Sequence, residues 1–265
     1  MRTRSAWIVA AFVALTAAFP AGAQDSATLK KIKDRKSIVL GVREAADPFS
    51  YVDAKGQYIG YSIDLCGKIV DAVKAALKMP DLAVTMTKVT PQVRMQMLMS
   101  GDVDMECGSS TNSVERQKSV AFAVTTFYTG TRLLVKPSSL IRGYKDLKGK
   151  TVVVTTGTTN ERAIKDYNLQ ESLGMKFMQV KDHREAIAAV QNGTAAAFAM
   201  DDVLLYAMRA NTANPAEFAV VGDFLTDEPY AIMLRKDDPA FKKLADDAIV
   251  ALFKSGEINK IYSRW

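Results

Sequence analysis

Cysteine, histidine and tryptophan are scarce in this chain of 265 residues, which contains two, one and two of them respectively. A structural zinc site takes four cysteine or histidine ligands at short spacings. Cys66, Cys107 and His183 do not form such a set, so the sequence indicates no metal site and no other cofactor. A framework of several disulfides is excluded because two cysteines allow one bond at most.

Long apolar runs are missing after the first 23 residues. At the start of the chain, Arg2 and Arg4 precede an apolar run over 7–19, and the small residues 21–23 follow it. This pattern predicts a cleaved secretory signal peptide over 1–23, too short and wrongly flanked for a membrane span. An uncleaved N-terminal anchor is the alternative. We therefore expect a soluble protein exported to the periplasm, without a lipid anchor because no cysteine follows the cleavage site.

Clusters of basic residues are also missing. The net charge of +6 falls to +4 without Arg2 and Arg4, which leaves 33 basic against 29 acidic residues. No basic stripe with interleaved aromatic residues is present, so nucleic acid is not an expected partner. The roughly 240 residues after the leader are enough for one or two domains.

A polar loop, residues 108–118, follows the apolar run 103–107, which reads as a buried strand. The loop has the sequence Gly-Ser-Ser-Thr-Asn-Ser-Val-Glu-Arg-Gln-Lys and leads into a predicted helix. Backbone N–H groups, small donors and the forked guanidinium of Arg116 form an anion site suited to a carboxylate. The alternative is an ordinary capped loop, because Ser, Thr and Asn are also preferred at helix N-caps.

Two series of strand and helix patterns follow one another along the chain. The predicted strands are 37–42, 83–89, 103–107, 151–155, 176–180 and 195–200. In each series a helix ends beside a glycine, Gly101 or Gly193, and the next strand leads to polar residues. This repeat predicts two α/β lobes with mostly parallel strands, whose carboxyl ends carry the functional side chains.

Two further strand-like stretches, near 125–134 and 229–235, connect these series. We expect lobe 1 over 24–129, lobe 2 over 130–230, and a return to lobe 1 over 231–265 with helical segments. A cleft between two lobes joined by two strands suits hinge closure around a small ligand.

Five motifs together resemble the polar amino acid-binding proteins of bacterial ABC uptake systems, solute-binding protein family 3, and their glutamate/aspartate-binding members above all. They are 60–65, 108–118, 157–159, 181–183 and 200–202. The resemblance covers 37–265 and implies a type II periplasmic-binding-protein fold, with two hinge-crossing strands and the ligand in the interlobe cleft. It implies a non-enzymatic monomer that delivers L-glutamate or L-aspartate to the permease subunits of an ABC transporter.

The resemblance also implies how the ligand's α-groups are held. Arg116, with Thr111 and Thr159, would hold the α-carboxylate, and Asp201 and Ser109 would hold the α-ammonium. For Asp201 the alternative is a simple cap of the helix that follows it.

For the side-chain carboxylate the resemblance implies Arg43, Arg94 and His183. An acidic amino acid has two carboxylates and one ammonium group. The predicted binding residues have more cationic side chains than carboxylates, which complements the charges of such a ligand. The arginines could instead be surface charges, and His183 a structural histidine. Pro91 stands where the resembled proteins have a serine, which leaves the order of glutamate and aspartate open.

Two other functions are compatible with a fold of this kind. An enzyme on the same fold, such as a cyclohexadienyl dehydratase, would need a general acid or base, and no extra carboxylate beside the arginines is evident in the sequence. A receptor sensor module would need a transmembrane or signalling segment, which we do not find.

Cys66 falls on the helix after 60–65 and Cys107 at the end of the strand 103–107, both in lobe 1, so the two could meet. An oxidising compartment would then favour a disulfide. Two buried thiols are the alternative.

Overall fold

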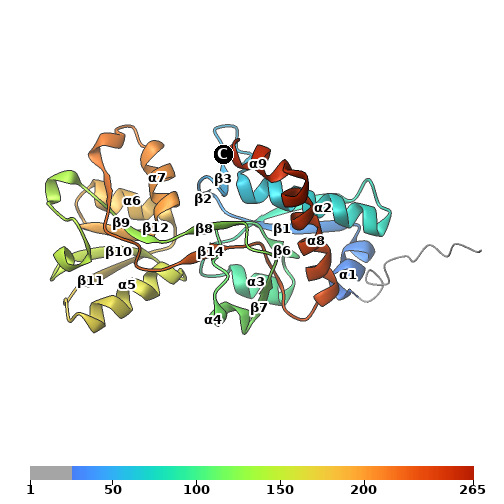
Figure 1. Ribbon diagram of the computed structural model, residues 1–265, viewed down its shortest axis with the longest axis horizontal. Coiled ribbons are helices and arrows are strands. Elements are labelled where there is room, and N and C mark those ends of the chain that lie inside the picture. Colours follow the sequence, from blue (N-terminus) through green and yellow to red (C-terminus); the bar gives the residue numbers. More distant parts are fainter. Residues whose placement is uncertain (1–25) are drawn as a thin grey trace, which may run out of the picture.

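The chain folds into two α/β lobes connected by a pair of strands (Figure 1). The computed structural model describes residues 26–265; the predicted signal peptide, 1–23, lies outside the described residues. Lobe 1 contains a sheet of order β5-β1-β6-β15-β7 and lobe 2 one of order β11-β10-β12-β9-β13. In each sheet the first three strands are parallel, the fourth pairs antiparallel with the third, and the fifth pairs antiparallel with the fourth. The predicted two-lobe α/β fold is confirmed.

Lobe 1 is built from both ends of the chain. Its first part comprises α1 (Ala27–Arg35), β1 (Ser37–Val42), β2 (Ala45–Ala46), β3 (Ser50–Val52), β4 (Tyr58–Ile59), α2 (Tyr61–Leu77), β5 (Ala83–Lys88), α3 (Arg94–Ser100), β6 (Met105–Glu106), α4 (Val114–Gln117) and β7 (Val120–Phe122). The returning part comprises β15 (Met233–Arg235), α8 (Pro239–Ser255) and α9 (Glu257–Tyr262). The two C-terminal helices, α8 and α9, pack against α2 of lobe 1.

Lobe 2 repeats the strand–helix order of lobe 1. Its strands and α-helices are β9 (Thr131–Val135), β10 (Thr151–Thr155), α5 (Thr159–Gln170), β11 (Lys176–Val180), α6 (His183–Gln191), β12 (Ala197–Asp201), α7 (Asp202–Ala210) and β13 (Ala219–Val221). Three 3₁₀ turns, η2 (Pro137–Ser139), η3 (Tyr144–Leu147) and η4 (Pro215–Glu217), lie in its connections. In Figure 1 α5 lies on one side of this sheet and α6 and α7 on the other.

Two short antiparallel strands, β8 (Phe127–Thr129) and β14 (Glu228–Tyr230), run between the lobes (Figure 1). They confirm the two predicted crossings between the lobes, but the predicted stretches 125–134 and 229–235 were too long. The stretch 229–235 divides into the end of β14 and β15, because the chain leaves one sheet and enters another within two residues. The stretch 125–134 likewise contains β8 and most of β9.

Leu65, Ile69 and Val73 recur at helical spacing in α2, and this spacing places them together on its buried face. The N-terminus of α5 carries a variant of the capping box. The hydroxyl of Thr158 accepts from the Glu161 amide, but the Glu161 carboxylate accepts from the amide of Gly157 rather than Thr158. The helix α3 begins at Arg94, after a turn that contains Pro91.

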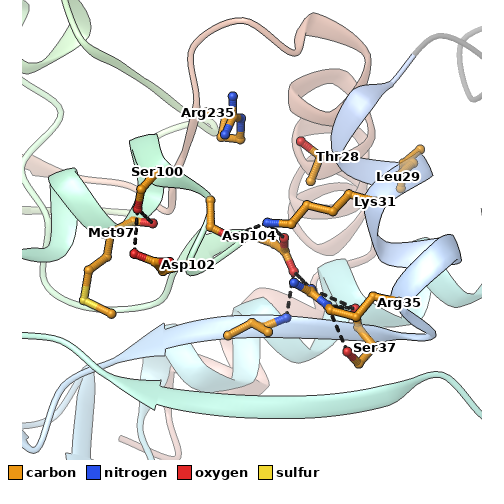
Figure 2. A network of polar contacts seen from close by, with 12 residues as sticks. Thr28, Leu29, Lys31, Arg35, Ser37, Met97, Ser100, Asp102, Asp104 and Arg235 are labelled. Atoms are coloured by element: carbon orange, nitrogen blue, oxygen red, sulfur yellow. Dashed lines mark hydrogen bonds and ion pairs between the residues drawn. The ribbon is translucent and has the colours of Figure 1, made fainter.

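A buried carboxylate anchors α1 to the sheet of lobe 1. Figure 2 shows Asp104 beside Lys31 and Arg35 of α1. Its Oδ2 also accepts from the backbone amide of Val39 in β1, with N and O 2.8 Å apart. Asp104 precedes β6, so this network holds the amino end of that strand, whereas the residues of the predicted site follow its carboxyl end.

Cys66 in α2 and Cys107, directly after β6, form the predicted disulfide, with Cα atoms 6.2 Å apart. Two buried thiols are therefore not the arrangement found. The bond ties the central helix of lobe 1 to the strand from which the polar loop 108–118 starts.

Candidate functional site

The predicted site residues gather where the carboxyl ends of the parallel strands of both lobes face each other. Arg43 directly follows β1, His183 lies shortly after β11, and Asp201 ends β12. Parallel strands present these ends at the same edge of a sheet. Seven of the eight predicted side chains are buried and the eighth, Thr159, is half-buried.

Arg43 and Arg94 form a buried pair of cations, with exposed fractions of 1% and 2%. They are therefore not surface charges. Arg94 Nη1 donates to the backbone oxygen of Ser109 at 3.3 Å and lies 3.7 Å from Oε1 of Glu106. Arg43 Nη2 lies 3.7 Å from Oδ2 of Asp182, in lobe 2. Burial, and then the charge of Arg94, lower the pKa of Arg43 to about 10, so it stays protonated at neutral pH.

Several polar atoms of this pair have no hydrogen-bond partner within residues 26–265. They are Nε and Nη2 of Arg43 and Nε of Arg94. Buried charged donors without an acceptor are costly, so they favour a bound anion between the lobes.

The polar loop 108–118 is held in place by the crossing strand β14. The amide of Asn112 donates to the oxygen of Pro229 at 2.7 Å, and Thr111 forms a β-bridge with Tyr230. The helix that follows, α4, is a single turn, so its dipole adds little and the anion site depends on Arg116. Burial, and then Arg94, lower the pKa of Arg116 to about 10.

His183 is the first residue of α6 and is buried, with Nδ1 2.9 Å from the hydroxyl of Thr155. Burial, followed by the charges of Arg43 and Arg94, lowers the pKa of the imidazole well below its usual value. The histidine is therefore neutral near pH 7 in this arrangement. It is both hydrogen-bonded, as a structural histidine would be, and close to the arginine pair, as the predicted role requires.

Asp201 stands at the N-cap position of α7, but its side chain makes no capping hydrogen bond, so the capping alternative is not supported. Its Oδ1 accepts from the amide of Asn160 at 2.6 Å, and Oδ2 accepts from the Tyr230 hydroxyl. Burial, and then the charge of Glu228, raise the pKa of Asp201 to about 7.

Two buried carboxylates in the site were missed by the sequence analysis. Glu106 lies under the arginines and its Oε2 accepts from the Ser110 hydroxyl at 2.5 Å. Glu228 accepts from the hydroxyls of Thr111 and Thr159. No extra carboxylate beside the arginines was evident in the sequence, whereas the structure places Glu106 beside Arg94. The burial of Glu228 is evident only in the structure, where β14 is buried, half-buried and buried along Glu228, Pro229 and Tyr230.

The two lobes touch each other around this site. Arg116 Nη2 donates to the oxygen of Gly157 at 3.3 Å, and Arg184 Nη2 donates to the oxygen of Glu44 at 2.6 Å. Asn211 Nδ2 donates to Oδ1 of Asp47 at 3.1 Å. These contacts, between residues of opposite lobes, define a closed arrangement in which the charged cluster is shielded from water.

The charged cluster can hold a small zwitterion with an extra carboxylate. Three buried arginines beside buried carboxylates suit a ligand that carries both signs of charge.

Two other features are not found within 26–265. No group of three or more His, Cys, Asp and Glu residues is arranged there to hold a metal ion. No helix in that part of the chain is long and apolar enough to cross a membrane.

Fold and site thus define a two-lobed binding protein for a small charged solute. The family model of bacterial extracellular solute-binding proteins, family 3, matches residues 38–265, so the chain belongs to that family.

Individual relatives agree with this assignment. The chain is 46% identical over 267 residues to the L-glutamate/L-aspartate-binding protein of Pseudomonas aeruginosa, covering 100% of this chain and 88% of the relative. It is 45% identical over 238 residues to the glutamate/aspartate import solute-binding protein of Salmonella typhimurium, covering 90% of this chain and 79% of the relative. A solved ancestral amino acid-binding protein, described as a precursor of cyclohexadienyl dehydratase, superposes with a TM-score of 0.78 at 29% identity, covering 90% of this chain and 99% of that one.

Proposed function

We propose that this protein captures glutamate or aspartate between its lobes in the periplasm and delivers it to the permease of an ABC importer. The names of the Pseudomonas and Salmonella relatives support this ligand and this role. A disulfide within lobe 1 supports an oxidising compartment. We further propose that the protein acts as a monomer that binds no nucleic acid, with the lobe boundaries expected from the sequence near the crossing strands.

One observation carries the choice of an acidic ligand. Arg43 and Arg94 keep N–H groups without a partner in the described part of the chain, although both side chains are buried. A ligand side-chain carboxylate would supply the missing acceptors, whereas an amide would supply one oxygen without charge. His183, at the same end of the site, would face that carboxylate as well.

The remaining charged groups suit the α-groups common to all amino acids. Arg116 is proposed to hold the α-carboxylate, with Thr111 and Thr159 beside it. Asp201 and Ser109 are proposed to hold the α-ammonium group. The raised pKa of Asp201 supports this, because a buried carboxylate with excess negative charge around it is stabilised by an arriving cation.

Calorimetry with ligand-free protein tests the proposal. Glutamate and aspartate should each bind at least about 100-fold more tightly than glutamine and asparagine, since an amide leaves buried charges unpaired. Arg43→Met and Arg94→Met should reduce this ratio. Arg132→Met is the control, because Arg132 contacts Gly222 and Tyr206 within lobe 2. Equal binding of glutamine and glutamate by the unmutated protein would overturn the proposal.

An enzymatic function receives less support. The relatives compared above are named for binding and import, and the carboxylates that could act as acid or base already have protein partners. Native mass spectrometry after incubation distinguishes the two: an unchanged amino acid supports a binding protein, and a product with altered mass supports an enzyme.

A further inference from the structure

Glu228 is a buried carboxylate at the centre of the site that the proposed ligand contacts do not use. It lies on the crossing strand β14, two residues before Tyr230, and both side chains are buried on the same face of that strand. Tyr230 donates to Asp201. The period of two along a strand thus brings Glu228 to the side of the site where Asp201 lies.

Three hydroxyl groups converge on the Glu228 carboxylate. Thr111 of lobe 1 and Thr159 of lobe 2 both donate to Oε2, the latter at 2.7 Å. Thr226 donates to Oε1, also at 2.7 Å. Because a hydroxyl has one hydrogen to give, the 3.3 Å contact between the Thr111 and Thr159 oxygens is not a second donated bond.

A chain of hydrogen bonds connects Glu228 to Asp201. Since the Thr226 hydrogen goes to Glu228, the Thr131 hydroxyl, 2.7 Å away, must donate to Thr226. Asn160 Nδ2 donates to Thr131 and to Oδ1 of Asp201. The chain ends on a carboxylate at both ends, Glu228 through Thr226 and Asp201 through Asn160, and bonds linked in this way strengthen one another.

We propose that Glu228 is an additional positioning residue of the amino-acid site. Its carboxylate holds the hydroxyls of Thr111 and Thr159 from opposite lobes and, together with Asp201, supplies the negative charge that faces the ligand's ammonium group. This inference rests on the proposed function, because it assumes a ligand with an α-ammonium group.

The charges around Asp201 agree with the proposal. The groups that face Asp201 are Glu228, Tyr230, Asn160 and Arg116, and burial followed by Glu228 raises the pKa of the Asp201 carboxyl. An ammonium group between Asp201 and Glu228 would offset this repulsion, which a ligand lacking nitrogen could not do.

Glu228→Gln keeps the shape of the side chain and removes its charge. Binding of glutamate should weaken about tenfold or more, since one partner of a buried charge interaction is lost. Binding of glutarate, the same dicarboxylate without the ammonium group, should be unchanged or tighter, because a nearby negative charge has gone. A merely structural role would instead weaken both ligands in parallel.

Two further variants keep the test informative if Glu228→Gln folds poorly. Glu228→Asp retains the charge and should bind glutamate better than Glu228→Gln does. Thr226→Val is the matched control, because it removes one donor to the same carboxylate and leaves the charge in place; it should keep the wild-type ratio of glutamate to glutarate affinity. Calorimetric competition measures all of these affinities.

A ligand-free measurement separates this proposal from the proposed function. Carbon-13 NMR of the Asp201 carboxyl should show a lower pKa in Glu228→Gln than in wild type. Wild-type protein that binds no amino acid would defeat the proposed function, while the Asp201 titration would still report on Glu228. Unchanged glutamate affinity in Glu228→Gln, or parallel loss of glutamate and glutarate binding, would overturn the role of Glu228.

Discussion

The guanidinium of Arg116, in lobe 1, donates a hydrogen bond to the carbonyl oxygen of Gly157, in lobe 2, with Nη2 and O 3.3 Å apart. The same guanidinium donates from Nη1 to the oxygen of Thr111 at 3.1 Å. One buried side chain therefore contacts both lobes at the point where we propose the ligand's α-carboxylate binds. Ligand binding and lobe closure would therefore both depend on Arg116.

Arg116→Ala should weaken every amino-acid ligand by about 2–4 kcal/mol, because the α-carboxylate would lose a buried, charge-assisted partner. Arg162→Ala is the control. Its side chain is 61% exposed and lies 3.7 Å from Glu115, an ion pair at the surface that contributes little. Calorimetry gives both dissociation constants. An unchanged constant in a folded Arg116→Ala protein would remove Arg116 from the site.

Gly157→Ala should impede closure. An added Cβ would lie 2.8 Å from Cα of Gln92 in the opposite lobe, and the φ of +84° also disfavours a side chain. We expect binding to weaken by about 1–3 kcal/mol, the range for overpacking a close contact. Gly149→Ala is the control, since its φ of +69° is similar and its Cβ would meet nothing within 4 Å. If the two substitutions weakened binding equally, backbone strain and not the interlobe contact would be the cause of the weaker binding.

His183→Ala should weaken glutamate more than a neutral amino acid and should flatten the pH dependence of glutamate binding. In the ligand-free protein burial, then Arg43 and Arg94, lower the pKa of His183 well below its usual value. A ligand carboxylate would raise that pKa, so binding takes up a proton and affinity falls as pH rises through the pKa of the complex. Binding curves from about pH 5.5 to 8.5 check this. Superimposable wild-type and mutant curves would leave His183 a structural role only.

Asp201 should make the ligand-free protein less stable as pH rises from about 4 to about 7. Its pKa is raised to about 7 in the folded state, first by burial and then by Glu228, against about 3.9 when unfolded. The folded state therefore binds more protons within this window, and that stabilisation is lost as pH rises through the folded pKa. Urea denaturation gives the free energy of unfolding of wild type and of Asp201→Asn. The difference between the two values should shrink or reverse towards pH 7. Asp71→Asn, at an exposed site on α2, should show no such trend.

Reduction of the Cys66–Cys107 disulfide should lower the unfolding free energy by about 2–4 kcal/mol. The bond closes a segment with a sequence separation of 41 and ties α2 to the strand that leads into the polar loop. Denaturation with and without reductant measures the difference, and a Cys66→Ser/Cys107→Ser protein should not respond to reductant. Two free thiols in denatured, unreduced protein would contradict the bond itself.

Several parts of the site could be predicted because they depend on local pattern. Arg43, His183 and Asp201 each follow or end an apolar strand, and strand ends in parallel sheets converge without any knowledge of side-chain contacts. The role of each residue came from resemblance, and its assignment to a ligand group stays a proposal.

Other parts depended on contacts between distant segments. Glu106 reads as an interruption of an apolar strand, and nothing local shows that it lies beneath Arg94. The stretch 229–235 looks like one strand, but β14 and β15 belong to different sheets because the chain crosses between lobes there. Phe253 fits the apolar pattern of α8 and yet is 47% exposed, which its spacing in the sequence did not indicate.

The sequence by itself determined the order of strands and helices, the two-lobe repeat and the set of basic residues at strand ends, because periodicity and turn chemistry act over a few residues. Only the tertiary structure decided which charges share the buried site. Glu228 meets Thr111 and Thr159 across separations of 117 and 69 residues. Burial and the balance of charge, which shift the pKa values of Arg43, His183 and Asp201, arise only when the two lobes bring these groups together.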